Sequence, residues 1–401
     1  MVNSLESQIE QQARQLAVLA GVSSNAVKVV ISPYRVCPIG AHSDHQGGPV
    51  LGMTVSAYTL LAFVPAPGSE LVLTSENYPG EVRVDLSDSS PSVDAGWSRY
   101  VHGTARAFAE RFPSSSQAMI GRVSGDLPAG GLSSSASVTL AYLTALAEVN
   151  SLSLEPHDLI QLALHAENKF VGVRVGILDP ATIVSARREH LVAIDTRNTQ
   201  WELLPYGSGE YRYRILIVFS GITRNLVDSA FNSRVNEALA AARQLAVLSE
   251  RNNVLGLHDL PDAVFDAYGD QLPPREKRRA RHFFAERTRV VRGKELWAQG
   301  DVEGFGRLMK ESCESSIHNW ESGSPELLAI YELLAGTPGI FGCRFSGAGW
   351  GGCCLALIDS RRAESIRWEV EQHLSLRLPR LREARVFLVD SEDGIRLVSA
   401  S

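Results

Sequence analysis

The sequence predicts an α+β protein, and three observations lead to this fold class. Apolar residues recur at helical spacing in several stretches, including residues 4–20 and 97–112. Short apolar segments typical of strands lie at residues 25–32, 190–195 and 213–219. Helices and strands do not alternate regularly in either half, so neither half has the pattern of a parallel βαβ sheet. The 401 residues are enough for about two to three domains.

The elements follow in chain order from this periodicity. The first half is expected to contain a helix at 4–20, a strand at 25–32, a glycine-bearing loop, strands within 50–75, a polar surface loop at 87–97, a helix at 97–112, a Gly- and Ser-rich loop that becomes a helix at Ser134, and a helix at 156–170. The second half adds the strands at 190–195 and 213–219, mostly helical sequence at 227–335, and a glycine loop that runs into a strand at 345–359. The basic run REKRRAR at 275–281 is interpreted as a solvated helix face.

Composition excludes several classes of protein. Hydrophobic residues make up 44% and charged residues 21%, which is ordinary for a soluble globular chain and excludes a wholly disordered one. The net charge of −6 is not concentrated in any block, so we expect neither nucleic acid nor a membrane surface as a partner. The N-terminus lacks the pattern of a signal peptide. Five cysteines without a CxxC spacing argue against structural zinc and favour reduced thiols in the cytoplasm.

Two glycine-rich segments are candidates for ligand contact. GGLSSSAS, residues 130–137, places glycines and serines before a helix, where free N–H groups and the helix dipole favour an anion such as a polyphosphate. It is neither a Walker A loop nor GxGxxG, and a plain helix cap is the alternative. SGAGWGG, residues 346–352, can approach a ligand closely because glycine has no Cβ, although a tight entry into a strand would look the same.

A third segment, PYRVCPIGAHSDHQGG at 33–48, carries Arg35, His42, Asp44 and His45 close together. No helix would place the two histidines as a ligand pair and no third ligand is evident, so we do not expect a metal there. Hydroxyl groups of a sugar need donors and acceptors at fixed angles, and a carboxylate supplies two acceptors. Sugar recognition is therefore the favoured interpretation of this segment.

These segments together resemble the three signatures of the GHMP kinases, in particular the galactokinase branch, in the same order along nearly the whole chain. RVCPIGAHSDHQGG is similar to the galactokinase sugar signature, LPAGGLSSSAS to the phosphate loop, and FSGAGWGGC to the third loop. NKFVGVRVGILD, at 168–179, resembles the segment that ends in the catalytic Asp. The resemblance implies a two-lobed fold with residues 1–205 in one lobe, residues 206–401 in the other, and the active site in the cleft between them.

The resemblance also implies roles for individual residues in an ATP- and Mg²⁺-dependent sugar-1-kinase. Asp179 is expected to accept or polarise the proton of the sugar's C1 hydroxyl, and Arg35 to steady that carboxylate and the moving phosphoryl group. Ser135 and Glu167 fall on the Mg²⁺ positions. The nucleotide positions are Trp97 by the adenine, Gly130, Gly131, Leu132, Ser133, Ser134, Ser135 and Ala136 around the phosphates, and Gly347 and Gly349 in the third loop.

The sugar positions implied by the resemblance are Ala41, His42, Asp44, Gly176 and Phe231. Galactokinases have a glutamate where this chain has Ala41, and that carboxylate meets the C6 hydroxyl of galactose. A substrate with a C6 carboxylate would be repelled by it by about 4 kcal/mol at about 4 Å. Alanine removes this charge, and the surrounding string SPYRVCPIGAHSDHQGG resembles galacturonokinases. The expected small-molecule substrate is therefore a sugar acid, D-galacturonate.

Other departures from the pattern bear on the chemistry. Pro180 follows the catalytic Asp in place of glutamine and should push Asp179 towards extended backbone. Phe231 replaces a tyrosine and loses a hydroxyl contact, while Arg224 or backbone amides are candidates to meet a C6 carboxylate. The alternatives are a galactokinase, a kinase of another galacto-configured sugar such as arabinose, and a sugar sensor without activity. A monomer is the default expectation.

Overall fold

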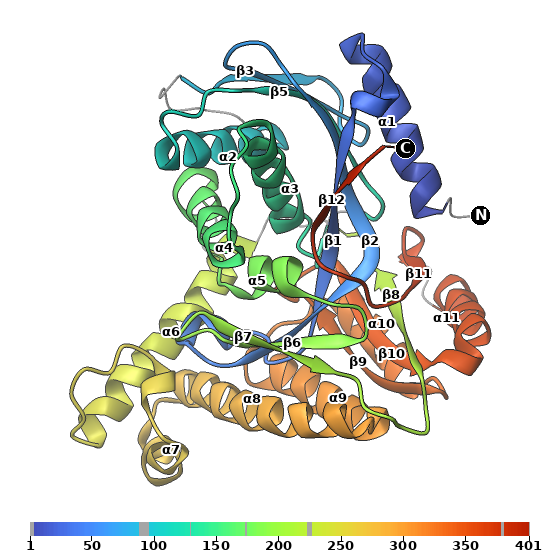
Figure 1. Cartoon of the computed structure of the whole chain (residues 1–401). Coiled ribbons are helices and arrows are strands. Elements are labelled where there is room, and N and C mark those ends of the chain that lie inside the picture. The colour runs from blue at the N-terminus through green and yellow to red at the C-terminus, as the bar shows by residue number, and fades with distance from the viewer. Residues whose placement is uncertain are drawn as a thin grey trace.

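The computed structural model describes residues 4–87, 96–128, 130–172, 175–222, 227–377 and 381–400, without the side chains of residues 227–231 and 377. The strands of this part form two sheets, and helices cover them (Figure 1). The α+β class is confirmed. No helix in these ranges has the length and apolar character needed to cross a membrane.

The first sheet is built mainly from the first half of the chain. Its main path runs in the order β12-β1-β2-β5-β3-β4, and β6 and β7 extend it from β2. Its strands are β1 (Lys28–Ile39), β2 (Val50–Pro65), β3 (Glu70–Ser75), β4 (Glu81–Asp85), β5 (Met119–Gly125), β6 (His190–Asp195), β7 (Gln200–Pro205) and β12 (Arg396–Ser399). Strand β12 pairs antiparallel with β1, so residues from the far end of the chain complete this sheet.

Helices bury both faces of the central strands β1 and β2, which explains their almost continuous apolar sequence. Helix α1 (Leu5–Ala20) packs on one face through Ala13 and Leu16. Helices α3 (Ser134–Val149) and α5 (Leu178–Ser185) pack on the other face. Helices α2 (Ser98–Arg111) and α4 (Pro156–His165) lie outside α3, and residues Ala166–Val171 continue from α4 as a π-helix.

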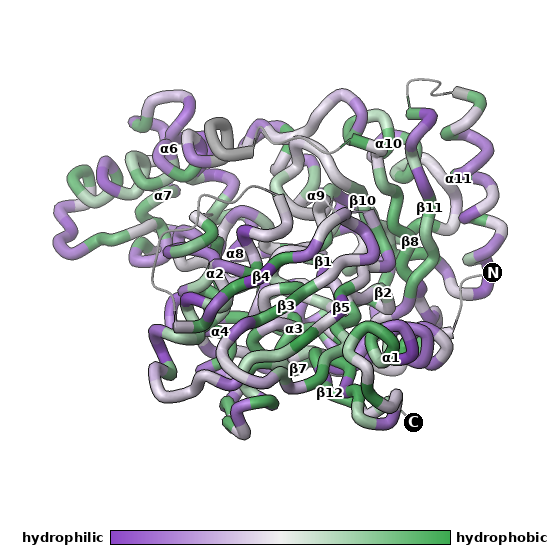
Figure 2. Tube along the Cα trace, turned by 90° about the horizontal axis from the view of Figure 1, so that it is seen from above, coloured by the Kyte–Doolittle hydropathy of each residue, from purple (hydrophilic) through white to green (hydrophobic). Residues whose placement is uncertain are grey.

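The second sheet belongs to the second half of the chain and has the order β11-β8-β10-β9. Its strands are β8 (Tyr213–Phe219), β9 (Ile340–Ser346), β10 (Cys353–Asp359) and β11 (Arg385–Val389). Helices α10 (Pro325–Gly336) and α11 (Ala363–Arg377) pack on one face. The other face shares a core with β1, β2 and the helices α8 and α9. Figure 2 shows hydrophobic segments along the strands, whereas α11 on the outside is largely hydrophilic.

Helices α8 (Pro274–Gln299) and α9 (Val302–His318) lie side by side below the two sheets, with α6 (Val227–Leu248) and α7 (Asp262–Tyr268) against α8 (Figure 1). The interpretation of residues 275–281 as a solvated face holds for the exposed ends of the run but is wrong for Arg279. Arg279 of that run is fully buried and pairs with Glu237, at 2.7 Å, and Glu321. A guanidinium can be buried in this way because two carboxylates compensate its charge.

Most of the expected helices and strands are confirmed, and the main error concerns β1. Residues 33–39 were expected to lie in the glycine-bearing loop that follows the strand at 25–32. Strand β1 in fact continues to Ile39, and its pairing with β2 shifts register between Pro33 and Tyr34 and between Val36 and Ile39. Proline fits a strand at such irregularities because no ladder hydrogen bond is required there. Most of the expected polar loop at 87–97, residues 88–95, lies outside the described part.

Candidate active site

Arg35 and Asp179 form an ion pair although they lie 144 residues apart in the sequence. The Nε atom of Arg35, on β1, donates to Oδ1 of Asp179, on α5, over 2.6 Å. The other carboxylate oxygen, Oδ2, accepts a hydrogen bond from the hydroxyl of Ser133. Burial opposes the charge of Arg35, but the neighbouring Asp179 carboxylate raises the pKa of the guanidinium above its ordinary value. The Asp179 side chain keeps 18% exposure, which leaves it accessible to a substrate.

The expected effect of Pro180 on Asp179 is wrong. Asp179 lies in the first turn of α5, which begins at Leu178, and Pro180 lies in the same turn. The first N–H groups of a helix have no partner within the helix, so the missing N–H of proline removes no hydrogen bond there. The prolyl residue therefore fits the helix start that positions the carboxylate.

The two glycine-rich loops pack against one another, backbone against backbone. A Cβ added to Gly131 would lie 2.8 Å from the Ser346 carbonyl oxygen, and one added to Gly347 would lie 2.9 Å from the Gly131 Cα. Gly131 also has a φ of +82°. Only glycine allows this approach, so the structure joins segments 130–136 and 346–353 into one surface. Gly349 lies further along the same turn, with a φ of +85°.

The N-terminus of α3 points its first N–H groups to this surface. Ser133 is the N-cap residue in a left-handed conformation, with no side-chain cap of its own. The main chain before it is fixed, because the Arg35 N–H donates to the Leu132 carbonyl over 3.2 Å. Leu132 and Ala136 themselves are buried in the core, so their side chains hold the loop in place. The free N–H groups suit an anion.

A cavity of about 450 Å³ lies beside this helix start. Its lining includes the expected residues Trp97, Ser134 and Ser135. Several lining residues had not been expected from the sequence, among them Tyr34, Asn77, Tyr78, Arg99 and Tyr100. The size and the mixture of aromatic and polar groups fit a small planar ligand next to the anion-binding helix. No sequence pattern indicated the contributions of β3 and β5, because they come together only in the folded sheet.

Glu167 is buried in the π-helix with its carboxylate close to the Arg35–Asp179 pair. Burial, and secondly the charge of Asp179, raise the pKa of Glu167 to about 8, while Arg35 lowers it. Its carboxylate makes no hydrogen bond or ion pair that we find among the described residues. When Glu167 is ionised, two carboxylates beside one guanidinium leave an excess negative charge, which a hard divalent cation would compensate. The donors therefore fit Mg²⁺, although the described residues contain no ready cluster of three or more His, Cys, Asp or Glu ligands.

Three of the expected sugar residues, Ala41, His42 and Asp44, lie in a tight turn after β1. His42 has a φ of +64° and its ring stacks on Trp320, with centroids 5.2 Å apart. Burial, followed by the neighbouring His282, lowers the pKa of His42 well below its ordinary value. Gly176 approaches the turn so closely that a Cβ on it would lie 2.2 Å from Oδ2 of Asp44. The structure thus brings Ala41, His42, Asp44 and Gly176 together.

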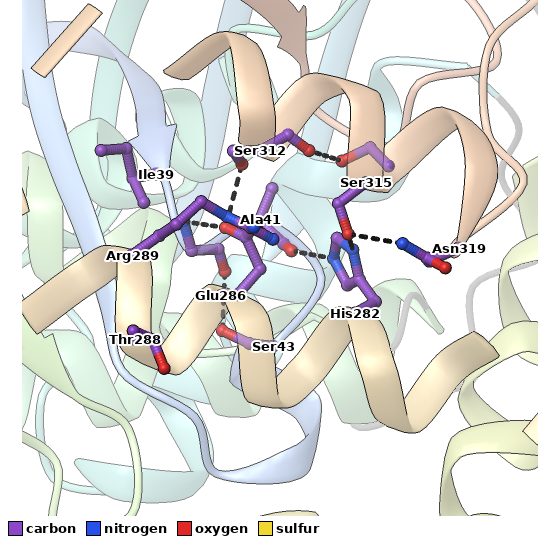
Figure 3. A network of polar contacts seen from close by, with 12 residues as sticks. Ile39, Ala41, Ser43, His282, Glu286, Thr288, Arg289, Ser312, Ser315 and Asn319 are labelled. Atoms are coloured by element: carbon purple, nitrogen blue, oxygen red, sulfur yellow. Dashed lines mark hydrogen bonds and ion pairs between the residues drawn. The ribbon is translucent and has the colours of Figure 1, made fainter. Parts of the chain in front are cut away.

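Buried polar groups on α8 and α9 support this turn, and sequence analysis missed them (Figure 3). The Nε2 atom of His282 lies 2.9 Å from the Ala41 carbonyl oxygen, and the Gly40 N–H donates to Glu286 over 2.6 Å. The only signal in the sequence was the unusual mixture of charged and aromatic residues in this segment. Two expectations cannot be placed: Arg224 and the side chain of Phe231 lie outside the described part.

Comparison with known proteins agrees with this geometry. A family model described as the GHMP kinases N terminal domain matches residues 99–187, and one described as GHMP kinases C terminal matches residues 294–376. A galacturonokinase from Arabidopsis thaliana is 38% identical over 380 residues, which cover 90% of this chain and 90% of that protein. A galactokinase from Thermococcus kodakarensis is 33% identical over 370 residues, covering 92% of this chain and 99% of the other.

Solved structures lead to the same fold. The crystal structure of Lactococcus lactis galactokinase complexed with galactose has a TM-score of 0.88 and 27% identity, and the match covers 97% of this chain and 99% of that one. A mevalonate kinase structure has a TM-score of 0.65 at 16% identity, over 91% of this chain and 99% of the other, and shows the fold alone.

Proposed function

Because this chain belongs to the GHMP kinases and is a sugar kinase that takes its phosphate from ATP, we propose that its acceptor is D-galacturonate. The reaction transfers the γ-phosphoryl group to the anomeric C1 hydroxyl and gives galacturonate 1-phosphate and ADP. The observation that carries this choice is Ala41, a small buried residue in the turn that also contains His42 and Asp44. The relative with 38% identity, a galacturonokinase, supports the same choice.

Asp179 is the base in this proposal, and Arg35 stabilises charge. As the C1 oxygen bonds to the γ-phosphorus and the bond to the ADP oxygen breaks, the hydroxyl proton passes to the Asp179 carboxylate. Hydrogen bonds to both oxygens of Asp179, from Arg35 and Ser133, fix its orientation. Arg35 also donates to the Gly131 carbonyl over 3.3 Å, so the base is tied directly to the phosphate loop. This coupling supports direct in-line transfer between two bound substrates.

The nucleotide contacts follow from the same surface. In this proposal the phosphates of ATP lie at Gly130, Gly131, Ser133, Ser134 and the N-terminus of α3. The adenine ring lies in the cavity beside Trp97. Ser135 and Glu167 are the residues that would hold Mg²⁺. When bound, this ion neutralises charge on the β- and γ-phosphates. Gly347 and Gly349 close the phosphate site from the third loop.

Selection at C6 is electrostatic in this proposal. A glutamate at position 41 would repel a C6 carboxylate by about 4 kcal/mol at a separation of about 4 Å. The turn instead has alanine there, with the rings of His42 and His45 beside Trp320. Asp44 retains the recognition of ring hydroxyls. Burial raises the pKa of Asp44, but His45 and Arg35 lower it by more, so this pKa lies below its ordinary value. A galacto-configured acid is the substrate that suits both features.

The test is release of ADP with Mg-ATP and, side by side, galacturonate, galactose, glucuronate and arabinose. We expect the highest kcat/KM with galacturonate. A lead for galactose or arabinose would assign the activity to that sugar, and absence of turnover with all four would favour a sensor. Retention of Arg35, Asp179 and the Ser135-Ala136 pair supports an enzyme.

A single substitution tests the selector itself. Ala41→Glu should lower kcat/KM for galacturonate by about 100-fold or more, because about 4 kcal/mol of repulsion corresponds to almost three orders of magnitude. The use of galactose should rise in the same variant. Ala41→Gln is the matched control, since it adds similar volume without the charge. If Ala41→Glu turns over galacturonate as well as the unmodified protein does, position 41 does not determine the choice of sugar.

Two broader features belong to the proposal. A cytoplasmic location is supported by the five cysteines, all of which are buried and free. We also propose that the chain acts as a monomer, because the arrangement of the described residues places both glycine loops and the sugar turn in one chain. Size-exclusion chromatography with light scattering checks this expectation.

A further inference from the structure

The turn that carries the sugar residues is not held by its own sequence alone. Gly40 has a φ of +96°, and a Cβ there would lie 2.8 Å from the Val50 Cα. His42 has a φ of +64°, a conformation that costs a non-glycine residue free energy and persists only where the surroundings enforce it. Within the turn, the Ser43 hydroxyl donates to the Gly40 carbonyl over 2.7 Å. The same hydroxyl also lies 3.1 Å from the Pro49 carbonyl oxygen, and further contacts come from the other half of the chain.

Helix α8 supplies two side chains to this backbone. His282 and Glu286 are four residues apart, so they lie on one face of the helix. Glu286 accepts the Gly40 N–H over 2.6 Å, and His282 contacts the Ala41 carbonyl from a position 241 residues away in the sequence. Both side chains are completely buried. Successive polar groups of the turn are therefore bound by one helix face, as Figure 3 shows.

The contact from His282 has a defined direction. A carbonyl oxygen can only accept, so Nε2 of the imidazole carries the proton and donates it to Ala41. In the neutral ring Nδ1 then accepts from the Ser315 hydroxyl, at 2.9 Å, and Ser315 in turn accepts from Asn319 over 3.1 Å. Burial lowers the pKa of His282 to about 4, which keeps the ring neutral. Helix α9 thus fixes the tautomer that α8 presents to the turn.

Glu286 belongs to a charged part of the same network. Its carboxylate also accepts from Ser312 over 2.9 Å and pairs with Arg289 at 2.6 Å. Arg344, on β9, donates to Ser312 and reaches the Pro38 carbonyl at 3.4 Å. Burial raises the pKa of Glu286, but Arg289, His282 and Arg344 lower it, so the pKa of this carboxyl lies below its ordinary value. The charge is compensated inside the protein and the carboxylate is available to the Gly40 N–H.

We propose that His282 and Glu286 are positioning residues that set sugar affinity by fixing the backbone of residues 40–42. They act on the orientation of His42 and Asp44, which follow the anchored groups directly. The phosphate loop receives no contact from this pair among the described residues, so ATP binding should be independent of it. This inference rests on the proposed role of the turn in binding the sugar.

Three variants on one helix test the proposal. His282→Phe removes the donor and keeps a ring, whereas His282→Gln keeps an N–H at the position of Nε2. Trp297→Phe is the control, because it removes another buried hydrogen bond of α8, from the indole to the Leu204 carbonyl over 3.1 Å, away from the turn. For each variant the KM values for sugar and ATP, kcat, the sugar Kd by calorimetry without ATP, and the unfolding temperature are measured.

We expect His282→Phe to raise the sugar KM and Kd by about tenfold, as for the loss of one buried hydrogen bond, with the ATP KM changed by less than about twofold. His282→Gln should recover most of the affinity. Trp297→Phe should lower the unfolding temperature and leave the sugar KM unchanged.

The proposal is overturned if His282→Phe is destabilised but binds sugar normally. It is also overturned if the glutamine variant is as weak as the phenylalanine variant, or if Trp297→Phe weakens sugar binding equally. The assays use whichever of the four sugars has the highest kcat/KM, and the Kd does not require turnover. A wrong assignment of galacturonate is therefore distinguishable from failure of this inference.

Discussion

The phosphate side and the sugar side of this site are built on different principles. The phosphate side, residues 130–136 and 346–353, is made of main chain, with glycines that pack backbone against backbone and the free N–H groups of α3. The sugar side, residues 40–45, is a turn whose backbone is bound by His282 and Glu286 of α8, and serines of α9 bind these two side chains in turn. Arg35 and Asp179 lie where the two meet.

The difference teaches where each half of the site is vulnerable. A surface of main chain depends on the absence of side chains, so the smallest addition disturbs it. A turn supported by side chains depends on distant partners and on their protonation. The first should therefore respond to added volume, and the second to lost hydrogen bonds and to acid.

The largest effect is expected at the point that the two sides share. Asp179→Asn keeps an oxygen that can accept from Arg35 but removes the base, so kcat should fall by about 1,000-fold or more. Sugar and ATP affinities should change by less than about threefold. Single-turnover measurement of ADP, together with calorimetric Kd values, checks this expectation. Turnover within tenfold of the unmodified protein would contradict the role of Asp179.

The next effect tests the phosphate side alone. Gly131→Ala places a methyl group 2.8 Å from the Ser346 carbonyl oxygen and 3.0 Å from Sγ of Cys353. We expect kcat/KM for ATP to fall by about 100-fold, with sugar Kd unchanged, because the loop must shift. Gly68→Ala is the matched control, since Gly68 has a φ of +79° with nothing within 4 Å of its added Cβ. Equal activity of the two variants would contradict close packing of the loops.

A third prediction concerns free energy of unfolding at Glu167. Its pKa is about 8 in the folded protein, against an ordinary value of 4.5 for a free glutamate. The folded state therefore binds more protons between these values, and stability falls as pH rises. Without divalent ions, Glu167→Gln should therefore be more stable than the unmodified protein at pH 8, by about 1–3 kcal/mol. The gain in stability should vanish below about pH 4.5. The same variant should also lose Mg²⁺-dependent activity.

Urea unfolding at pH 4.5 and 8 with a chelator measures this difference. A glutamine variant that is less stable at pH 8 would show that the carboxylate is compensated inside the protein and needs no cation.

The smallest expected effect is a pH dependence of unfolding stability that comes from His282, on the sugar side. His282 has a pKa of about 4 in the folded protein, against an ordinary value of 6.5 for histidine, so the unfolded state binds more protons between these values. Stability is then lost as pH falls from 6.5 towards 4, with a slope of at most about 1.4 kcal/mol per pH unit from this residue. His282→Gln should show a shallower slope in urea unfolding. An unchanged slope would mean that His282 is accessible to protons in the folded protein.

The same contrast explains what could be predicted from the sequence. The phosphate side was visible because glycines and serines lie next to one another along the chain, so GGLSSSAS and SGAGWGG indicate their geometry locally. The pairing of Arg35 with Asp179 followed from the resemblance to the GHMP kinases, since no spacing rule connects a strand residue with one in α5. The fold class needed only the periodicity of the longer elements.

The support of the sugar side could not be predicted, because it is made across the fold. Segment 275–289 contains many charged residues and is typical of a solvated helix, but Arg279, His282 and Glu286 face inward and find partners on other elements. Pro38 and the glycines after it were interpreted as a loop, whereas the structure continues the strand, with register shifts, to Ile39. Pro180 suggested extended backbone because the start of α5 was not recognised.

Strand β12 gives the molecule a dependence on the order of its synthesis. Residues 396–399 cover the edge of β1, one of the first strands that a ribosome produces. Until residue 399 has emerged from the exit tunnel, a growing chain carries the backbone N–H and C=O groups of that edge unpaired. Strand β12 therefore protects this edge, and chaperone binding or self-association of nascent chains would concentrate on β1 before β12 is made. A chain that stops before residue 396 would keep the edge unpaired.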